Sequence, residues 1–316
     1  MVDAMNTPTS TSPTQRTAPN GFIVVAVLWI LSTLSALVSI YAVYVINTAG
    51  GFAVHDHRLR AEALVSAAIE LTAYRQLTAR ALARPTRGQF NFQLGQADVA
   101  VEFQSETARI DLNAAPKQLL AGMFLALGEN RDRAEFYSDR IIEWRTAPTG
   151  SLDSASSAYR AAGLPYAPRG AKFPHTSELS LVRDLPISVV ERTLPFVTVY
   201  SGRPKINVLN AAPEVIAALP GMERERLNAI LSQRQVFPGN GEALLPLLGA
   251  AQQYATTDGG NTIRVTVRIV FDTGRQTVSE AIILVFEAGD KPYAVLSRRD
   301  EQIERRADSA RWAGLR

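Results

Sequence analysis

Few residues of this chain stand at a spacing that could support catalysis or metal binding. His55 and His57 flank Asp56, but positions i and i+2 of a helix point to different faces, so a shared metal ion would require extended backbone. His175 has no serine or acid beside it that would build a triad. The 316 residues include no cysteine, and we find no phosphate loop, dinucleotide glycine fingerprint or zinc-peptidase motif. The sequence therefore predicts a protein that is not an enzyme.

One segment has a spacing typical of nucleic-acid binding. The stretch "INVLNAAPEVIAALPGMERERLNAILSQR" is similar to a helix-hairpin-helix unit, whose hairpin glycines offer N–H groups to a phosphate. Gly221 occupies the first glycine position, but Glu223 stands at the second and would repel a phosphate. The net charge of +3 is also low for a nucleic-acid binder. We favour a helical hairpin shaped by Asn210, Pro213 and Gly221; the alternative is a membrane-anchored helix-hairpin-helix DNA-binding protein of a competence-like system.

A long apolar segment near the N-terminus predicts a membrane anchor. Residues 22–46 contain no charge, and about 20 helical residues cross the hydrocarbon layer of a bilayer. A buried core helix is the other interpretation of such a pattern, but the length and terminal position favour a transmembrane helix. Counting lysine and arginine gives little information on its orientation, because Arg16 precedes the span and Arg58 and Arg60 follow it.

The rest of the chain alternates between helix and strand patterns. Leu64, Ala67, Leu71 and Tyr74 follow the 3,4 spacing of one helix face. Alternating residues predict a β-hairpin over 90–103 and further strands over 262–271, 277–286 and 292–297. Seven short helical patterns lie between these strand regions. Strands from both regions must share a sheet to bury their apolar faces, so we predict an α+β fold with an inserted helical module.

The helical module contains an internal similarity. "RIDLNAAPKQLLAGMFLALG" and "KINVLNAAPEVIAALPGM" both carry the tetrapeptide "NAAP". Pro116 and Pro213 suit the first turn of a helix, and we expect Asn113 and Asn210 to close the preceding turns with their side chains. The repeat is either a common way to begin a helix or the mark of a duplication.

These features together resemble one family, the large minor pseudopilin, component K, of the bacterial type II secretion system (general secretion pathway protein K). The resemblance covers most of the chain. It rests on Gly21 before Phe22, the apolar helix, the "NAAP" repeat, "SELSLVRDL" and "KINVLNAAPEVIAALPGM". It implies a pilin-like fold, in which a long N-terminal helix packs on an antiparallel sheet, with a large all-α insertion containing two SAM-like or helix-hairpin-helix-like units.

The resemblance also implies a division of the chain and its processing. Prepilin peptidase would cut between Gly21 and Phe22, with methylation at Phe22. We expect the following parts: 1–21 leader, 22–46 transmembrane part of the first helix, 47–108 first part of the pilin-like core, 109–258 inserted helical domain, 259–297 C-terminal strands and 298–316 charged, flexible tail. The leader, with one arginine, is long enough to allow a start codon at Met5.

The family's location and partners follow in the same way. The resemblance implies a single-pass protein of the inner membrane of a Gram-negative bacterium, with its soluble domain in the periplasm. The expected partners are the other minor pseudopilins, the major pseudopilin, prepilin peptidase, the inner-membrane assembly platform and the lipid bilayer, with no nucleic acid. The expected role is to initiate the pseudopilus at its tip and help export folded proteins across the outer membrane.

This sequence departs from the family pattern at the fifth mature residue and in the loop region around Asp153. Pilins carry a glutamate as the fifth mature residue, but here that residue is Ala26. Placing an unpaired acid in a membrane costs about 2.5 to 3.5 kcal/mol, so the glutamate is tolerated only where it pairs with a neighbouring subunit. This chain lacks the glutamate and therefore cannot make that contact.

Some family members bind calcium through acid-rich loops. The corresponding residues 146–173 have Asp153 as their one acid, so we expect no calcium site and no cofactor.

Overall fold

The computed structural model describes residues 20–79, 84–147, 152–236, 241 and 244–303. It divides into two compact units, Met1–Arg60 and Ala61–Arg316, and helix α1 (Asn20–Thr78) contributes to both. In the first unit, Phe22–Val45 has a mean hydropathy of 2.5 and is the one described segment long and apolar enough to cross a membrane. This segment is consistent with a single N-terminal anchor.

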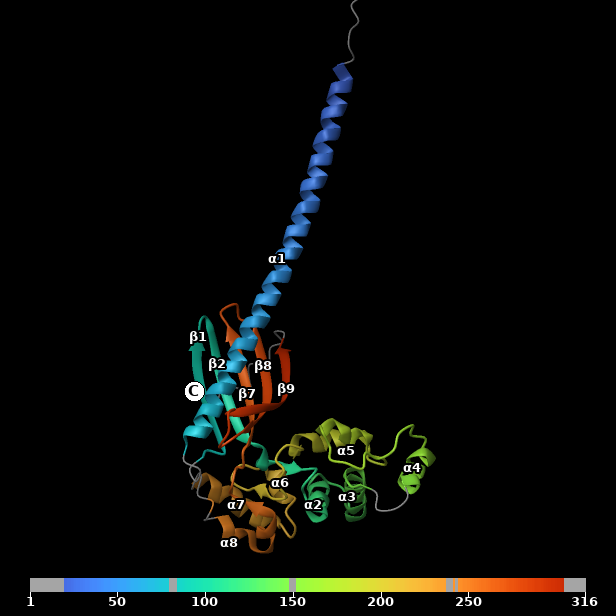
Figure 1. Cartoon of the computed structure of the whole chain (residues 1–316), viewed down its shortest axis with the longest axis vertical. Coiled ribbons are helices and arrows are strands. Elements are labelled where there is room, and N and C mark those ends of the chain that lie inside the picture. The colour runs from blue at the N-terminus through green and yellow to red at the C-terminus, as the bar shows by residue number, and fades with distance from the viewer. Residues whose placement is uncertain (1–19, 80–83, 148–151, 237–240, 242–243, 304–316) are drawn as a thin grey trace, which may run out of the picture. The chain divides into compact units, whose positions relative to one another are not determined.

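The second unit contains one five-stranded antiparallel sheet, with strand order β1-β2-β7-β8-β9 (Figure 1). The strands are β1 (Arg87–Leu94), β2 (Ala97–Ser105), β7 (Thr262–Phe271), β8 (Gln276–Val285) and β9 (Tyr293–Ile303). The predicted hairpin and the predicted C-terminal strands are confirmed. Because β2 pairs directly with β7, residues 106–261 enter and leave the sheet between two adjacent strands.

The core of the sheet lies under α1. Alternate residues of the central strands are buried together with one face of the helix, formed by Leu64, Val65, Ala68, Ile69 and Ala73. The expected helix face is wrong in part, because the side chains of Leu71 and Tyr74 are 40% and 65% exposed. Apolar residues occur around much of this helix, so its spacing alone did not identify the side that packs on the sheet.

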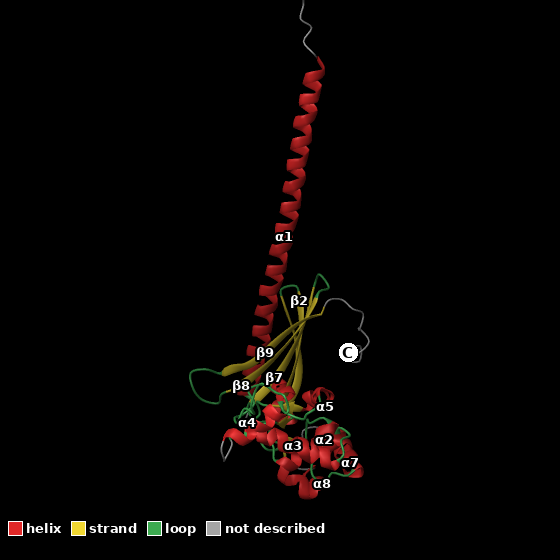
Figure 2. Ribbon diagram, turned by 90° about the vertical axis from the view of Figure 1, so that its right-hand side faces the viewer, coloured by secondary structure: helices red, strands yellow, loops and turns green. Residues whose placement is uncertain are grey.

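The segment between β2 and β7 consists of short helices and very short strands, which Figure 2 shows outside the sheet. The helices are η2 (Glu106–Ala108), α2 (Lys117–Ala126), α3 (Arg131–Arg145), α4 (Leu152–Ala161), η3 (Thr176–Leu181), α5 (Ile187–Thr193), η4 (Leu194–Phe196), α6 (Pro213–Ala217), α7 (Arg224–Val236), α8 (Leu245–Leu248) and η6 (Gly249–Tyr254). The short strands are β3 (Ile110–Asp111), β4 (Val197–Thr198), β5 (Ile206–Asn207) and β6 (Ala255–Thr256). They share one hydrophobic core, separate from that of the sheet.

The beginning of the expected flexible tail is a strand. Residues 298–303 continue β9 and pair with β8 after a register shift between Ile282 and Ile283. The Ser279 hydroxyl and the Asp300 carboxylate lie 2.5 Å apart across this pair. Charged side chains suit the edge of a sheet, so the charge of this stretch does not prevent strand pairing. The remaining residues of the expected tail, 304–316, lie outside the described part.

Candidate functional site

The first candidate feature is a turn that leads from β3 into α2. The buried Asp111 carboxylate accepts hydrogen bonds from the backbone N–H groups of Asn113 at 2.7 Å and Ala114 at 3.1 Å. Its second oxygen accepts from the Ser201 hydroxyl at 2.9 Å and from the Gly202 N–H at 2.7 Å. One acidic side chain therefore closes the turn and holds the chain beyond β4 against it.

A corresponding turn leads from β5 into α6. The Asn207 side-chain oxygen accepts from the Leu209 N–H at 2.9 Å, and its amide nitrogen donates to the Thr257 carbonyl at 3.2 Å. In both turns the fourth residue after this side chain donates back to its carbonyl, Ala115 to Asp111 at 2.8 Å and Ala211 to Asn207 at 3.0 Å. Both short strands also pair in parallel, β3 with β4 and β5 with β6.

Aligning the two segments by these hydrogen bonds gives a different result from aligning their identical "NAAP" tetrapeptides. Asp111 corresponds to Asn207, so the two "NAAP" tetrapeptides are offset by one residue. Pro116 is the N-cap of α2, whereas Pro213 is the first residue of α6. We call residues 109–202 the first helical segment and residues 205–258 the second.

The expectation that the "NAAP" asparagines close the turns is therefore wrong. Asn113 instead holds the main chain of Phe173, accepting from its N–H at 2.7 Å and donating to its carbonyl at 2.9 Å. Asn210 donates from its amide to the Thr86 hydroxyl. The residues that close the turns, Asp111 and Asn207, precede the identical letters, and the tertiary pairing of β3 and β5 sets their position.

An arginine completes each turn, and the sequence reasoning missed both. Arg145, at the end of α3, donates to the Leu112 carbonyl at 2.5 Å and the Ala115 carbonyl at 2.8 Å. Arg234, near the end of α7, donates to the carbonyls of Val208 at 3.2 Å and Ala211 at 2.7 Å. Burial lowers the pKa of both guanidinium groups from its ordinary value. The common signal in the sequence is an arginine in the last turn of the second helix of each segment.

The two segments meet where α2 contacts α6. A Cβ atom added at Gly122 would lie 1.9 Å from the Ala218 carbonyl oxygen, so the residue in α2 has to be glycine for this approach. Counting from the two turns, Gly122 and Ala218 occupy equivalent places, eleven residues after Asp111 and Asn207 respectively. Helices α2 and α6 thus contact each other through equivalent residues of the two segments.

The hairpin after α6 contains a glycine in the left-handed region. Gly221 has a positive φ of 73°, which glycine adopts without strain. The N–H of the next residue, Met222, donates to the Leu219 carbonyl at 3.0 Å. Glu223 and Glu225 are exposed beside this turn. Their negative charges oppose the approach of a phosphate to the hairpin.

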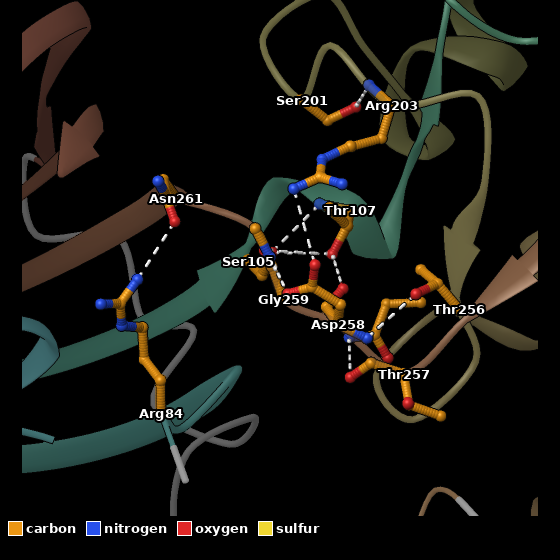
Figure 3. Close-up of polar contacts among 12 residues, drawn as sticks. Arg84, Ser105, Thr107, Ser201, Arg203, Thr256, Thr257, Asp258, Gly259 and Asn261 are labelled. Atoms are coloured by element: carbon orange, nitrogen blue, oxygen red, sulfur yellow. Dashed lines mark hydrogen bonds and ion pairs between the residues drawn. The ribbon is translucent and has the colours of Figure 1, made fainter. Parts of the chain in front are cut away.

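The two connections between the sheet and the helical segments are bonded to each other (Figure 3). The Thr107 hydroxyl donates to the carbonyls of Asp258 and Gly259, each at 3.3 Å, and the Ser105 hydroxyl also donates to Gly259. Next to these hydrogen bonds, the Asp258 carboxylate lies 3.5 Å from the Arg203 guanidinium. The outgoing strand β2 and the incoming strand β7 are therefore fixed together at the point where the insertion begins and ends.

A buried charge cluster supports this junction from inside. The Arg264 guanidinium on β7 lies 2.7 Å from the Glu106 carboxylate and also contacts Glu280. The Thr198 hydroxyl of β4 donates to Glu106 as well. Burial acts to lower the pKa of Arg264, but the charge and hydrogen bonds of Glu106 and Glu280 outweigh it and raise that pKa. Since a buried charge without partners is costly, the cluster ties the sheet to the first helical segment.

The remaining predicted positions lie near the N-terminus or in α4. Gly21, Phe22 and Ala26 belong to the beginning of α1, and the Phe22 side chain is 74% exposed. Residues 1–19 of the expected leader lie outside the described part. Asp153 belongs to α4, and the described residues contain no cluster of three His, Cys, Asp or Glu side chains that could hold a metal ion.

Comparisons with known proteins give one partial sequence match and one match of fold. Residues 94–202 match the sequence model for protein K of the type II secretion system. The fold is similar to that of a chain in the crystal structure of the GspK-GspI-GspJ complex from the enterotoxigenic Escherichia coli type 2 secretion system. The TM-score is 0.55 and the identity 18%, and the match covers 79% of this chain and 98% of that one. No curated protein sequence matches the chain.

Proposed function

We propose that this chain belongs to the type II secretion system protein K family and is the minor pseudopilin that stands at the tip of the pseudopilus and initiates its assembly. Membership in this family is supported by the match over residues 94–202 and by the similar fold. As a minor pseudopilin it is a structural subunit and not an enzyme. The position at the tip, the processing of the N-terminus and the periplasmic location of residues 61–316 are parts of the proposal.

The observation that carries the proposal is the absence of an acid at the start of α1. Phe22–Val45 forms an apolar helix, and Ala26 occupies its fifth position. A filament subunit can use a buried glutamate there to pair with the free amine of a neighbouring subunit, which offsets the cost of placing a charge in the bilayer. This chain has no such group to pair with the amine of a subunit ahead of it. Its own amine at Phe22 can still pair with the glutamate of the subunit behind it.

The insertion supports the same position. It leaves the sheet after β2 and returns at β7, and its own hydrophobic core includes residues from Ile110 to Ala255. The Glu106–Arg264 pair and the Thr107 hydrogen bonds fix this domain to the sheet. The domain therefore adds bulk at the end of the sheet where β2 ends and β7 begins. Within a thin filament such bulk would obstruct neighbouring subunits, whereas at the end of the filament it has free space.

The chain of similar fold was crystallised in a complex of GspK with GspI and GspJ. We accordingly propose that the other minor pseudopilins are the direct partners of this chain. Contacts with the major pseudopilin and with the assembly platform of the inner membrane complete the proposed set. The chain would then support the export of folded proteins across the outer membrane.

The first experiment is coexpression of the full chain with the prepilin peptidase of its own secretion system. Intact mass measurement should show the loss of residues 1–21, and expression without the peptidase is the control. A mass that does not change would contradict processing between Gly21 and Phe22, and with it the pseudopilin role. A second measurement is copurification with the other minor pseudopilins, which a tip subunit requires.

A further inference from the structure

The two edges of the sheet differ in how they are protected. Strands β1 and β9 each border one strand, β2 or β8. An edge strand presents unpaired N–H and C=O groups, which another chain can use to add a strand unless side chains prevent it. The edges can therefore be compared by the residues that they carry.

The edge formed by β9 has two protective features. Its residues 298–301 read "RRDE", with all four side chains charged. The Arg298 guanidinium and the Asp300 carboxylate form an ion pair at 3.0 Å. The pairing with β8 also shifts register between Ile282 and Ile283, and such an irregularity bends a strand away from a regular edge. Both features disfavour the addition of a strand on this side.

The edge formed by β1 has neither feature. After Arg87, the first residue of the strand, residues 88–96, "GQFNFQLGQ", contain no charge and no proline. Strand β1 pairs with β2 in continuous register over all eight of its residues, from Arg87 to Leu94. Figure 1 shows β1 at the border of the sheet, opposite β9. A long, regular edge whose one charged residue stands at its first position is the kind that accepts another strand.

The two faces of β1 define the chemistry of a matching strand. Phe90 and Phe92 belong to the core under α1, with their ring centroids 6.4 Å apart, and the Arg75 guanidinium lies 3.9 Å from the Phe90 ring. Phe92 is only partly buried, and Leu94 is 54% exposed. The apolar layer under α1 thus continues to the edge without being fully covered there. A strand added at this edge would cover it with apolar side chains.

The other face of β1 carries amide side chains. Gln89 and Asn91 are exposed and alternate with the phenylalanines. Amide groups are both donors and acceptors, so they suit polar, uncharged residues on a neighbouring strand. The strand that fits β1 therefore alternates apolar and uncharged polar residues.

We propose that the outer edge of β1, with which no other described strand than β2 pairs, is a docking site for such an extended segment of another pseudopilus subunit, which adds a sixth strand to the sheet. The identity of the partner rests on the proposed function, whereas the choice of edge rests on the contrast between β1 and β9. A second copy of this chain is the competing occupant, because "QFNFQ" reads the same in both directions. The crosslinking experiment below distinguishes these two occupants.

Photocrosslinking in the full chain tests this proposal. Leu94 on β1 and Val295 on β9 are matched positions, because they are exposed apolar side chains on the two edges, 54% and 48% exposed. Each is replaced in turn by p-benzoylphenylalanine, and the chain is coexpressed with the other pseudopilins of its own system. Adducts are identified by mass spectrometry. We expect an adduct with another pseudopilin from position 94 and at least tenfold less from position 295.

A charge placed on the edge provides the second readout. Asn91→Lys should lower the yield of the adduct from position 94 at least tenfold, while Asn91→Gln should change it less than twofold, and both should leave the melting temperature unchanged. Equal yields from the two edges, no effect of the lysine, or an adduct between two copies of this chain would overturn the proposal. If the pseudopilins copurify and position 94 gives no adduct, the docking edge is wrong but the proposed function stands. If they do not copurify, both the proposed function and the proposed partner are wrong.

Discussion

The two helical segments build the same turn from different side chains. Asp111 in the first segment is ionisable and accepts four hydrogen bonds, whereas Asn207 in the second both accepts and donates. The difference follows from what faces each residue. Asp111 meets a hydroxyl and an N–H group of residues 201–202, while Asn207 meets the Thr257 carbonyl, to which only a donor can bind. What the two segments share is therefore a pattern of hydrogen bonds more than a string of identical residues.

The segments also differ in their cores. The first contains α4 and a group of aromatic side chains, in which Trp144 stacks on Phe173 with centroids 6.2 Å apart and also contacts Tyr159 and Tyr166. The Tyr159 hydroxyl accepts from the Arg183 N–H at 3.2 Å, and burial raises the pKa of this tyrosine. After α7 the second segment has the short helices α8 and η6, where the first has α4, η3, α5 and η4 after α3. The first segment is thus longer between its second helix and its closing strand.

The contact between the segments should be the most sensitive point of this arrangement. We expect Gly122→Val to destabilise the chain by about 3 kcal/mol, because its Cβ would collide with the Ala218 carbonyl and overpacking of this kind forces the backbone to move. Thermal unfolding of the detergent-solubilised chain, followed by circular dichroism, measures the effect. The reciprocal Ala218→Gly should cost only about 1 kcal/mol. Equal effects of the two changes would mean that α2 and α6 do not approach as described.

The arginines test whether the two turns are equivalent. Arg145→Met and Arg234→Met each remove two hydrogen bonds from a charged donor to backbone carbonyls, and each should cost about 2 kcal/mol. Arg192→Met, which removes bonds of a half-exposed arginine to Leu127 and Glu129, is the control and should cost about half as much. Urea unfolding provides the measurement. A loss from one of the two turn arginines alone would break the equivalence.

The smallest expected effect sharpens the difference between Asp111 and Asn207. Asp111→Asn keeps an oxygen for the turn but directs an amide group at the Gly202 N–H, so we expect a loss of about 1 kcal/mol. Ser201→Ala removes the hydroxyl partner and leaves the carboxylate in place, and should cost less. If Asp111→Asn proves neutral in the same urea assay, the acid is not required by residues 201–202.

The strands were predictable because their patterns are local. In β7, buried and half-buried residues alternate from Ile263 to Phe271, and this alternation of apolar and polar residues is visible in the sequence. Helices α2, α3 and α7 were likewise expected from their spacing. The packing side of α1 was not, since Leu71 is as apolar as the residues that contact the sheet and Tyr74 carries a large apolar ring. Only the partner surface distinguishes the two sides.

The candidate site was less predictable for a related reason. The identical "NAAP" letters pointed to Asn113 and Asn210, but the turns depend on Asp111 and Asn207, whose positions are set by pairing with β4 and β6 far along the chain. The reach of Arg145 and Arg234, and the need for glycine at position 122, likewise arise from tertiary contacts. The sequence shows an arginine in the last turn of the second helix of each segment, but not which carbonyl groups that arginine reaches.

The central claim is that this chain begins a filament and does not extend it. The most direct test is to label the C-terminus of the full chain with an epitope, isolate pseudopili and locate the label by immunogold electron microscopy. The absence of an acid at Ala26 and the bulk of the insertion predict one label at one end of each filament. Labels distributed along the length of the filaments would contradict the account.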